Sequence, residues 1–266
     1  MNKARLKRME NGQLVYYCDK ADAQYWDELW ERSICKEYYE KYLNGNLDEY
    51  EQIFIKYLRK SDRIIEAGCG TARYVVALGA KGYSFIEGVE WGEKTVNSVI
   101  KLFPTLPVRV GDVANLKVPD NFYDVYISLG VVEHRIEGPE PYLDESFRIL
   151  KSGGIAIISV PYVNMLRRIK GLLGRYENNN LLDHDFYQYA FSHSKFVKYL
   201  QKSGYKVVET KSIAGYFGLQ EEIPLLFVSL DKIRGGWRIK ERIKRSKWVD
   251  VFGHMKIYIC KKPIIS

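Results

Sequence analysis

A short apolar pair that ends in an acid and a glycine-rich turn constrains the fold of this chain more than any other segment. Ile64 and Ile65 lead into Glu66-Ala67-Gly68-Cys69-Gly70, and an apolar run over 74–78 follows. The pattern predicts a buried strand, a tight turn and a helix. Glycines let the backbone approach a ligand closely, and a new helix offers unpaired N–H groups. The segment therefore predicts a seat for a nucleoside-containing ligand at the carboxyl end of a first parallel strand.

Beyond this turn, strand and helix patterns alternate along the chain. Such alternation is typical of βαβ units around a parallel sheet. Arg73 stands where a dinucleotide-binding fingerprint would place its third glycine, so a dinucleotide is disfavoured as the ligand. Strands are expected at 64–67, 84–90, 108–110, 124–129 and 154–160, and helices at 72–80, 93–102 and 139–150.

Four short segments, taken in order, resemble the motifs of the class I S-adenosylmethionine-dependent methyltransferases. The first is Glu66–Gly70, and Glu90 then ends the second expected strand. Gly111-Asp112-Val113 follows the third strand, and Val131-Val132-Glu133-His134 follows the fourth. The turn Leu150–Gly154 before the fifth strand is also similar, although many relatives carry proline near its centre.

The resemblance implies an α/β fold, with a Rossmann-like, seven-stranded, mostly parallel sheet and helices on both faces. A helix at 194–203 and strands beginning at 204 and 255 would complete it. Residues 1–50 are expected to form a helical N-terminal cover, and residues 51–266 the methyltransferase domain. Two insertions, 163–190 and 218–252, are expected to set acceptor specificity.

The resemblance also implies S-adenosylmethionine as cofactor and S-adenosylhomocysteine as its product. Glu66 would hold the ammonium end of the cofactor, Glu90 its ribose, and Asp112 with the Val113 backbone N–H its adenine edge. Trp91 either lies against the adenine face or packs beneath the following helix, and both interpretations stay open. The other cofactor contacts expected are Ala67, Gly68, Cys69, Gly70 and Leu129.

Methyl transfer requires an aligned acceptor and the exclusion of water, and a hydroxyl acceptor also needs a base. His134 is the candidate general base because it follows strand four on the cofactor side, and Glu133 is its candidate partner. Alternatively, His134 only shapes the loop or seats the cofactor, and Glu133 caps the next helix. Some relatives bind a metal through E-x-x-E-H here, but Gly130 replaces the first glutamate, so no metal is expected.

The expected acceptor is a hydroxyl on a small molecule, either a saccharide or a phosphorylated or lipid-linked compound. N-methylation of a small molecule or protein, RNA methylation, and cofactor binding without turnover are the alternatives. The sequence leaves the oligomeric state open. Candidate acceptor contacts in and before the first insertion are Tyr162, His184, Asp185 and Tyr189.

The net charge of +8 permits an anionic partner but selects none. Basic residues gather at 167–175 and at 232–247, and the second group follows an apolar run over 223–228. That combination suits a membrane interface, whereas a solvated helix face is the commoner explanation of such charge. Nucleic acid is disfavoured as substrate, because the chain lacks a [DN]-P-P-[YFW] loop and a cysteine near strand four or five. We expect a cytoplasmic protein with peripheral membrane contact.

Overall fold

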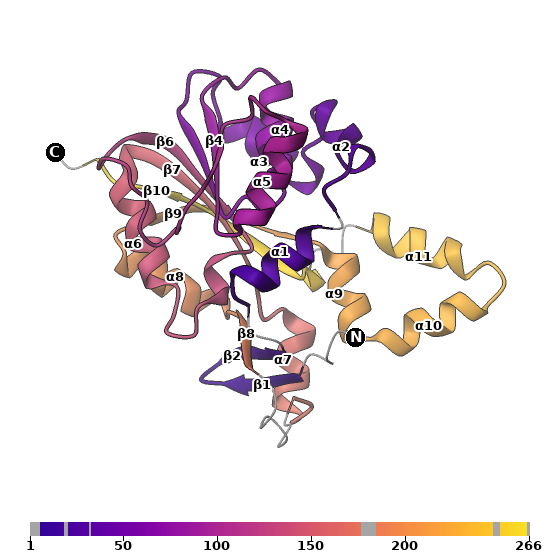
Figure 1. The fold of residues 1–266 in the computed structure, drawn as a ribbon. Helices are drawn as coiled ribbons and strands as arrows, with labels where there is room; N and C mark the ends of the chain where they lie inside the picture. Colours follow the sequence, from indigo (N-terminus) through magenta and orange to yellow (C-terminus); the bar gives the residue numbers. More distant parts are fainter. Residues whose placement is uncertain (1–5, 19–20, 32, 177–184, 247–250, 265–266) are drawn as a thin grey trace.

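The computed structural model describes residues 6–18, 21–31, 33–176, 185–246 and 251–264. Its centre is a seven-stranded sheet with the strand order β5-β4-β3-β6-β7-β10-β9 (Figure 1). β10 is antiparallel to β7 and β9, and the other neighbours are parallel, which confirms the predicted sheet. Its strands are β3 (Ile64–Ala67), β4 (Ile86–Glu90), β5 (Val108–Val110), β6 (Tyr123–Leu129), β7 (Leu150–Pro161), β9 (Lys206–Ile213) and β10 (Met255–Lys261).

Helices cover both faces of the sheet, because successive strand residues point to opposite sides. Ile64 packs in a cluster with residues of α3, α4 and α5, whereas Ile65 packs in a second cluster with residues of α6 and α8. Both side chains are fully buried, as expected for a parallel strand covered on two sides. These helices are α3 (Glu51–Tyr57), α4 (Arg73–Ala80), α5 (Glu93–Leu102), α6 (Glu140–Ile149) and α8 (His193–Lys202).

The first 50 residues, predicted as a helical cover, begin with a β-hairpin that precedes their helices. Asn11 and Gly12 join its strands with φ values of 49° and 76°, and two consecutive positive φ values are typical of a type I′ turn. The hairpin pairs with β8 of the first insertion, so two segments far apart in sequence form one three-stranded antiparallel sheet. The elements concerned are β1 (Leu6–Glu10), β2 (Gln13–Cys18), α1 (Ala23–Glu31), α2 (Lys36–Leu43) and β8 (Asp185–Ala190).

Buried ion pairs anchor the first insertion, so two of its basic residues, Arg167 and Lys170, are not part of a free surface cluster, whereas Arg168 and Arg175 are exposed. α7 (Met165–Leu172) carries Arg167, which is fully buried and contacts Glu221 at 2.6 Å and Glu222 at 3.1 Å. Lys170 also pairs with Glu222, at 2.8 Å. A buried charge is costly unless it is paired, so Arg167 and Lys170 serve to dock α7 against α9.

The second insertion contains a helical arm, residues 224–245, that projects from the body of the molecule (Figure 1). α9 (Gly215–Glu222) lies at its base, and α10 (Pro224–Lys232) and α11 (Gly236–Arg245) pack against each other beyond it. Within the described ranges, every helix is too short or too polar to cross a bilayer.

Candidate functional site

The turn after β3 has a backbone conformation that favours glycine. Gly68 and Gly70 have φ values of 74° and 52°, in the left-handed region that disfavours side chains. A Cβ atom on Gly68 would lie 2.5 Å from a methyl group of Val131, and one on Gly70 would lie 3.2 Å from the ring of Trp30. The two glycines therefore let the turn fit between the loop after β6 and helix α1.

An open cavity lies beside this turn, at the carboxyl ends of β3, β4 and β6. Its empty volume, including the part open to solvent, is about 830 Å³. A ligand crevice at this end of the strands is the general rule for open α/β sheets. The predicted site residues that line the cavity are Gly68, Gly70, Glu90, Trp91, Asp112, Val113, Leu129 and His134.

Three predicted cofactor residues, in or just before the turn, do not line this cavity. Ala67 is fully buried at the end of β3, and the buried Cys69 thiol packs toward Gly88. Glu66 is 3% exposed, and its Oε2 atom has no hydrogen-bond partner among the described residues. Burial raises the pKa of Glu66 to about 8, against an opposing effect of Arg73. Glu66 is thus a buried carboxyl with acceptor capacity directly beneath the glycine turn.

Glu90 holds together the two loops that border the cavity. Its Oε2 accepts the backbone N–H of Gly70 at 2.7 Å, and its Oε1 accepts those of Trp91 at 2.8 Å and Gly92 at 3.1 Å. Burial raises the pKa of Glu90, whereas these N–H groups oppose that rise. A carboxylate offers about four lone-pair positions, so one remains for a ligand hydroxyl.

Asp112 and Trp91 line the cavity together with Glu90. Asp112 accepts the backbone N–H of Ala114 at 2.8 Å, which fixes the loop after β5. The Trp91 side chain is 52% exposed and lines the cavity. Trp91 is therefore not packed beneath the following helix, which was one of its two expected positions.

Helix α1 faces the sheet across the cavity with two tryptophans. Trp26 and Trp30 stack with their ring centroids 6.2 Å apart, and both line the cavity. Their i, i+4 spacing places them on one face of the helix. Asp27 anchors this helix, because its Oδ1 accepts the backbone N–H and the hydroxyl of Thr95 at 2.8 and 2.7 Å. Trp26 and Trp30 together form an aromatic lid at the cavity. Trp30 was not among the residues expected from the sequence, although this spacing was an available signal.

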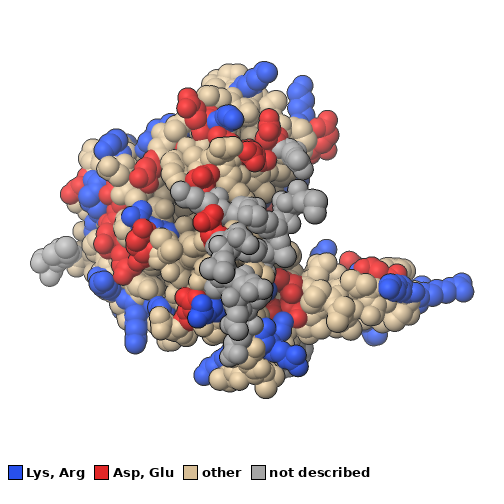
Figure 2. Space-filling model, turned by 60° about the horizontal axis from the view of Figure 1, so that its bottom comes forward, with Lys and Arg blue, Asp and Glu red and all other residues tan. Residues whose placement is uncertain are grey.

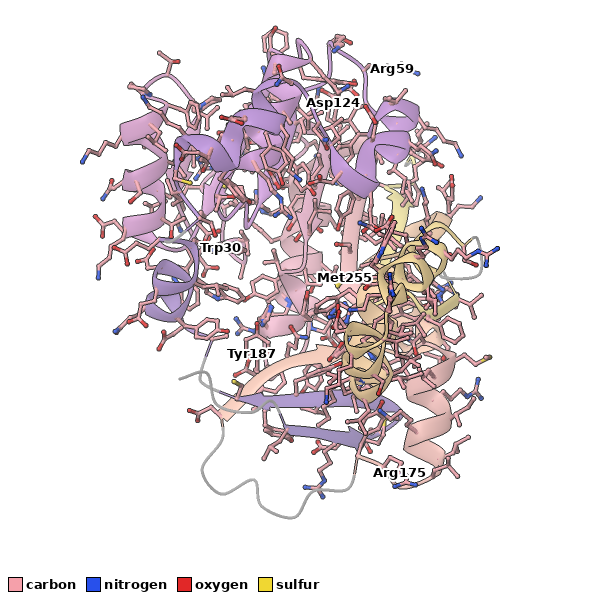
Figure 3. All side chains as sticks on the ribbon, turned by 90° about the vertical axis from the view of Figure 1, so that its right-hand side faces the viewer. Trp30, Arg59, Asp124, Arg175, Tyr187 and Met255 are labelled. Carbon is pink, nitrogen blue, oxygen red and sulfur yellow. The ribbon has the colours of Figure 1, made fainter. Side chains whose placement is uncertain are left out.

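His134 lies at the wall of the cavity, and neighbouring groups fix the orientation of its ring. Nδ1 is 2.8 Å from the backbone carbonyl oxygen of Tyr187. A carbonyl oxygen only accepts, so Nδ1 carries the proton and Nε2 is the basic nitrogen. The rings of Trp26 and Tyr187 meet the imidazole edge-on, at centroid distances of 4.8 and 5.0 Å. Figure 3 shows that Tyr187 comes from β8, on the small sheet beneath α1, whereas Trp30 comes from α1 itself.

Glu133 is poorly placed to be the ionic partner of His134. Its Oε1 lies 3.9 Å from Nε2, beyond hydrogen-bond distance. Glu133 is 1% exposed, and burial raises the pKa of its carboxyl to about 8, which favours the neutral form at pH 7. The Tyr187 carbonyl, which the sequence did not indicate, orients the imidazole instead.

The candidate acceptor contacts do not gather at the cavity. Tyr162 is buried, and its hydroxyl oxygen accepts a hydrogen bond from Ser212 at 3.2 Å. The Tyr189 hydroxyl donates to the carbonyl of Ile136 at 2.8 Å, and Asp185 is exposed on β8. None of these three lines the cavity, and His184 lies outside the described residues, so their roles stay predictions. Arg135 and Tyr142 do line the cavity and were missed. In the described part of the chain, no three or more His, Cys, Asp or Glu side chains are grouped to hold a metal.

Comparisons with known proteins agree with this arrangement. A family model described as a methyltransferase domain matches residues 65–158, from β3 into β7. A protein of Mycolicibacterium smegmatis named "Probable S-adenosylmethionine-dependent methyltransferase" is 28% identical over 183 residues. That alignment covers 69% of this chain and 64% of the relative, so the chain spans less than two thirds of that relative's length.

Solved structures share the fold at low sequence identity. A structure from Haloferax volcanii, solved as a complex of a methyltransferase with its activator Trm112, has a TM-score of 0.59 at 17% identity. The alignment covers 93% of this chain and 98% of the other chain. The [4+2]-cyclase SpnF has a TM-score of 0.55 at 16% identity, and the alignment covers 81% of this chain and 80% of the SpnF chain. The family match falls on the strands that carry the glycine turn, Glu90 and Asp112, so residues 65–158 are similar to the methyltransferase domain and the chain is similar to S-adenosylmethionine-dependent methyltransferases.

Proposed function

We propose that this chain catalyses methyl transfer from S-adenosylmethionine to a hydroxyl group of a small-molecule acceptor, with His134 as general base. The observation that carries the proposal is the contact between His134 Nδ1 and the Tyr187 carbonyl oxygen, at 2.8 Å. It fixes the tautomer in which Nε2 can take a proton, in a ring that lines the cavity. The bound cofactor supplies an electrophilic methyl group on a positively charged sulfonium.

The residues around the glycine turn fit this cofactor. Glu90 has one acceptor position left for a ribose hydroxyl after its three backbone contacts. Glu66 offers a buried oxygen without a described partner, and an ammonium group at the turn would favour its ionised form. Asp112 and Val113 line the part of the cavity suited to the adenine edge, and the exposed Trp91 ring suits the adenine face.

Catalysis would depend on alignment, proton removal and the exclusion of water. His134 Nε2 would accept the acceptor's hydroxyl proton as its oxygen approaches the methyl carbon, and release that proton to solvent afterwards. Trp26 and Trp30 would shield the reacting groups, because they face the sheet across the cavity. The acceptor is proposed to be a saccharide or a phosphorylated or lipid-linked compound.

The experiment that tests this proposal separates cofactor binding from turnover. A panel of saccharides, phenols and lipid-linked alcohols is offered with S-adenosylmethionine, and formation of S-adenosylhomocysteine is followed. We expect His134→Ala to lower the rate about 100-fold or more, the range for loss of a general base, with little change in cofactor affinity. His193→Gln is the matched control, because His193 stacks on Tyr258 and does not line the cavity.

Unchanged turnover in His134→Ala would remove the base from the mechanism and favour an amine acceptor, which needs less help from His134. Tight cofactor binding without turnover on any acceptor would favour a different activity. The [4+2]-cyclase SpnF is an example of such a different activity, because it has a similar fold and is named for chemistry other than methyl transfer.

A further inference from the structure

The helical arm, residues 224–245, carries several apolar side chains that are exposed to solvent. Helices that pack only against each other would be expected to bury such side chains between them. α10 and α11 pack against each other, and α10 buries Phe227 and Leu230, which are 2% and 7% exposed. On the other side of α10, Leu225 is 79% exposed and Val228 is 50% exposed. Scattered exposed apolar residues are ordinary, but a row of them on one short element marks an interaction surface.

Trp237 adds an aromatic side chain to this exposed set. It stands in the first turn of α11 and is 65% exposed, with the Arg238 guanidinium 5.4 Å from its ring centre. Tryptophan with an adjacent cation is typical of a membrane–water boundary, where the ring enters the headgroup region and the cation contacts phosphate. Ile233 and Ile239 are exposed nearby, at 56% and 45%.

The charge of the arm is strongly positive. Residues 224–245 contain seven basic and two acidic residues. Asp231 is paired with Lys240, and the exposed cations of the arm are Lys232, Arg234, Arg238, Arg242 and Lys244. Figure 2 shows the arm standing clear of the body, with a broad uncharged face and basic side chains at its tip. An apolar face bordered by cations is complementary to an anionic lipid surface.

We infer that this arm is a membrane-binding element that places α10 and α11 in the headgroup region of an anionic bilayer. The apolar side chains enter the acyl boundary and the cations contact lipid phosphates. A second copy of the chain is the poorer occupant, because two such arms would bring their positive charges together. The arm lies outside the cavity residues, so the inference is independent of the proposed methyl transfer.

The test is flotation of the full chain, without cofactor or acceptor, with unilamellar vesicles. Vesicles of equal parts phosphatidylglycerol and phosphatidylcholine are compared with pure phosphatidylcholine vesicles. We expect binding to the anionic vesicles that weakens with salt, and much weaker binding to the neutral ones. The double variant Arg238→Gln/Arg242→Gln should weaken binding about 10-fold or more, and Leu225→Ser/Val228→Ser should weaken it similarly.

A matched control removes the same charge elsewhere. Lys101→Gln/Lys206→Gln changes two exposed lysines on α5 and β9, and we expect it to bind anionic vesicles like the unmodified chain. All substituted side chains are exposed, so the thermal unfolding midpoints should stay close to the original.

Three outcomes would overturn the inference: no binding to anionic vesicles, equal loss of binding in the control, or unaffected binding in both arm variants. The inference would also be overturned if an arm variant bound vesicles normally but changed the oligomeric state measured by light scattering. The arm would then be an interface between copies of the chain. Retention of RNA that depends on the arm, without vesicle binding, would assign the charge to nucleic acid instead.

Discussion

Asp27 on α1 and Thr95 on α5 join the aromatic lid to the helix that follows β4. Asp27 Oδ1 accepts both the backbone N–H and the hydroxyl of Thr95, at 2.8 and 2.7 Å. The carboxylate thus satisfies an N–H group in the first turn of α5, where the helix dipole also favours negative charge. The lid is therefore positioned by the helix that follows Glu90 and Trp91.

Asp27→Ala should loosen α1 and weaken the cavity wall. We expect a loss of about 1–3 kcal/mol in the free energy of unfolding, because Thr95 loses its partner in a buried position. Glu31→Gln, an exposed position on the same helix, is the control and should stay within about 0.5 kcal/mol. Denaturant unfolding measures both variants, and equal stability of Asp27→Ala and the original would refute the anchoring role.

Gly68→Ala tests the close approach of the glycine turn to the loop after β6. The new methyl group would meet Val131, and the φ of 74° disfavours any side chain, so we expect at least about 1 kcal/mol of destabilisation. Adding Val131→Ala should recover part of this cost, since it removes the two methyl groups nearest the new Cβ. Gly12→Ala is the control for φ alone, because its φ is 76° but no atom lies within 4 Å of its Cβ position. Costs that are equal for Gly68→Ala and Gly12→Ala, with no recovery by Val131→Ala, would argue against the steric contact.

The buried carboxyl of Glu133 should make stability fall with rising pH. Because burial raises its pKa to about 8, the folded chain keeps a proton that the unfolded chain releases above about pH 4.5. The free energy of unfolding should therefore decrease from about pH 5 to about pH 8. Glu133→Gln should make the free energy of unfolding less dependent on pH, although the similar contribution of Glu66 remains. Glu93→Gln, at an exposed position, should leave the pH dependence unchanged. Identical slopes in Glu133→Gln and the original would contradict the raised pKa.

The sequence predicted the elements whose signals are local. Ile64-Ile65 and the glycine turn indicated β3 and its loop, and the spacing to Glu90 and Asp112 located two more strand ends that line the cavity. The β1–β2 hairpin was not predicted although Asn11-Gly12 is a strong turn signal, because the helical patterns of α1 and α2 dominate the first 50 residues.

The missed features depend on contacts between distant segments. Tyr187 orients His134 only because β8 of the first insertion pairs with β2 of the N-terminal hairpin. Arg167 is buried because Glu221 and Glu222 of the second insertion pair with it. Neither pairing leaves a periodic pattern in the sequence, so the insertions appeared there as separate basic segments.

Titration calorimetry with S-adenosylmethionine and S-adenosylhomocysteine tests the central claim most directly. We expect both ligands to bind the unmodified chain, and Glu90→Ala to weaken binding by about 1–3 kcal/mol, the range for a hydrogen bond to a charged group. Glu93→Ala, an exposed glutamate at the start of α5, should bind both ligands normally. Absence of binding to the folded, unmodified chain would contradict the cofactor site. Equal affinity in Glu90→Ala would contradict the role assigned to Glu90.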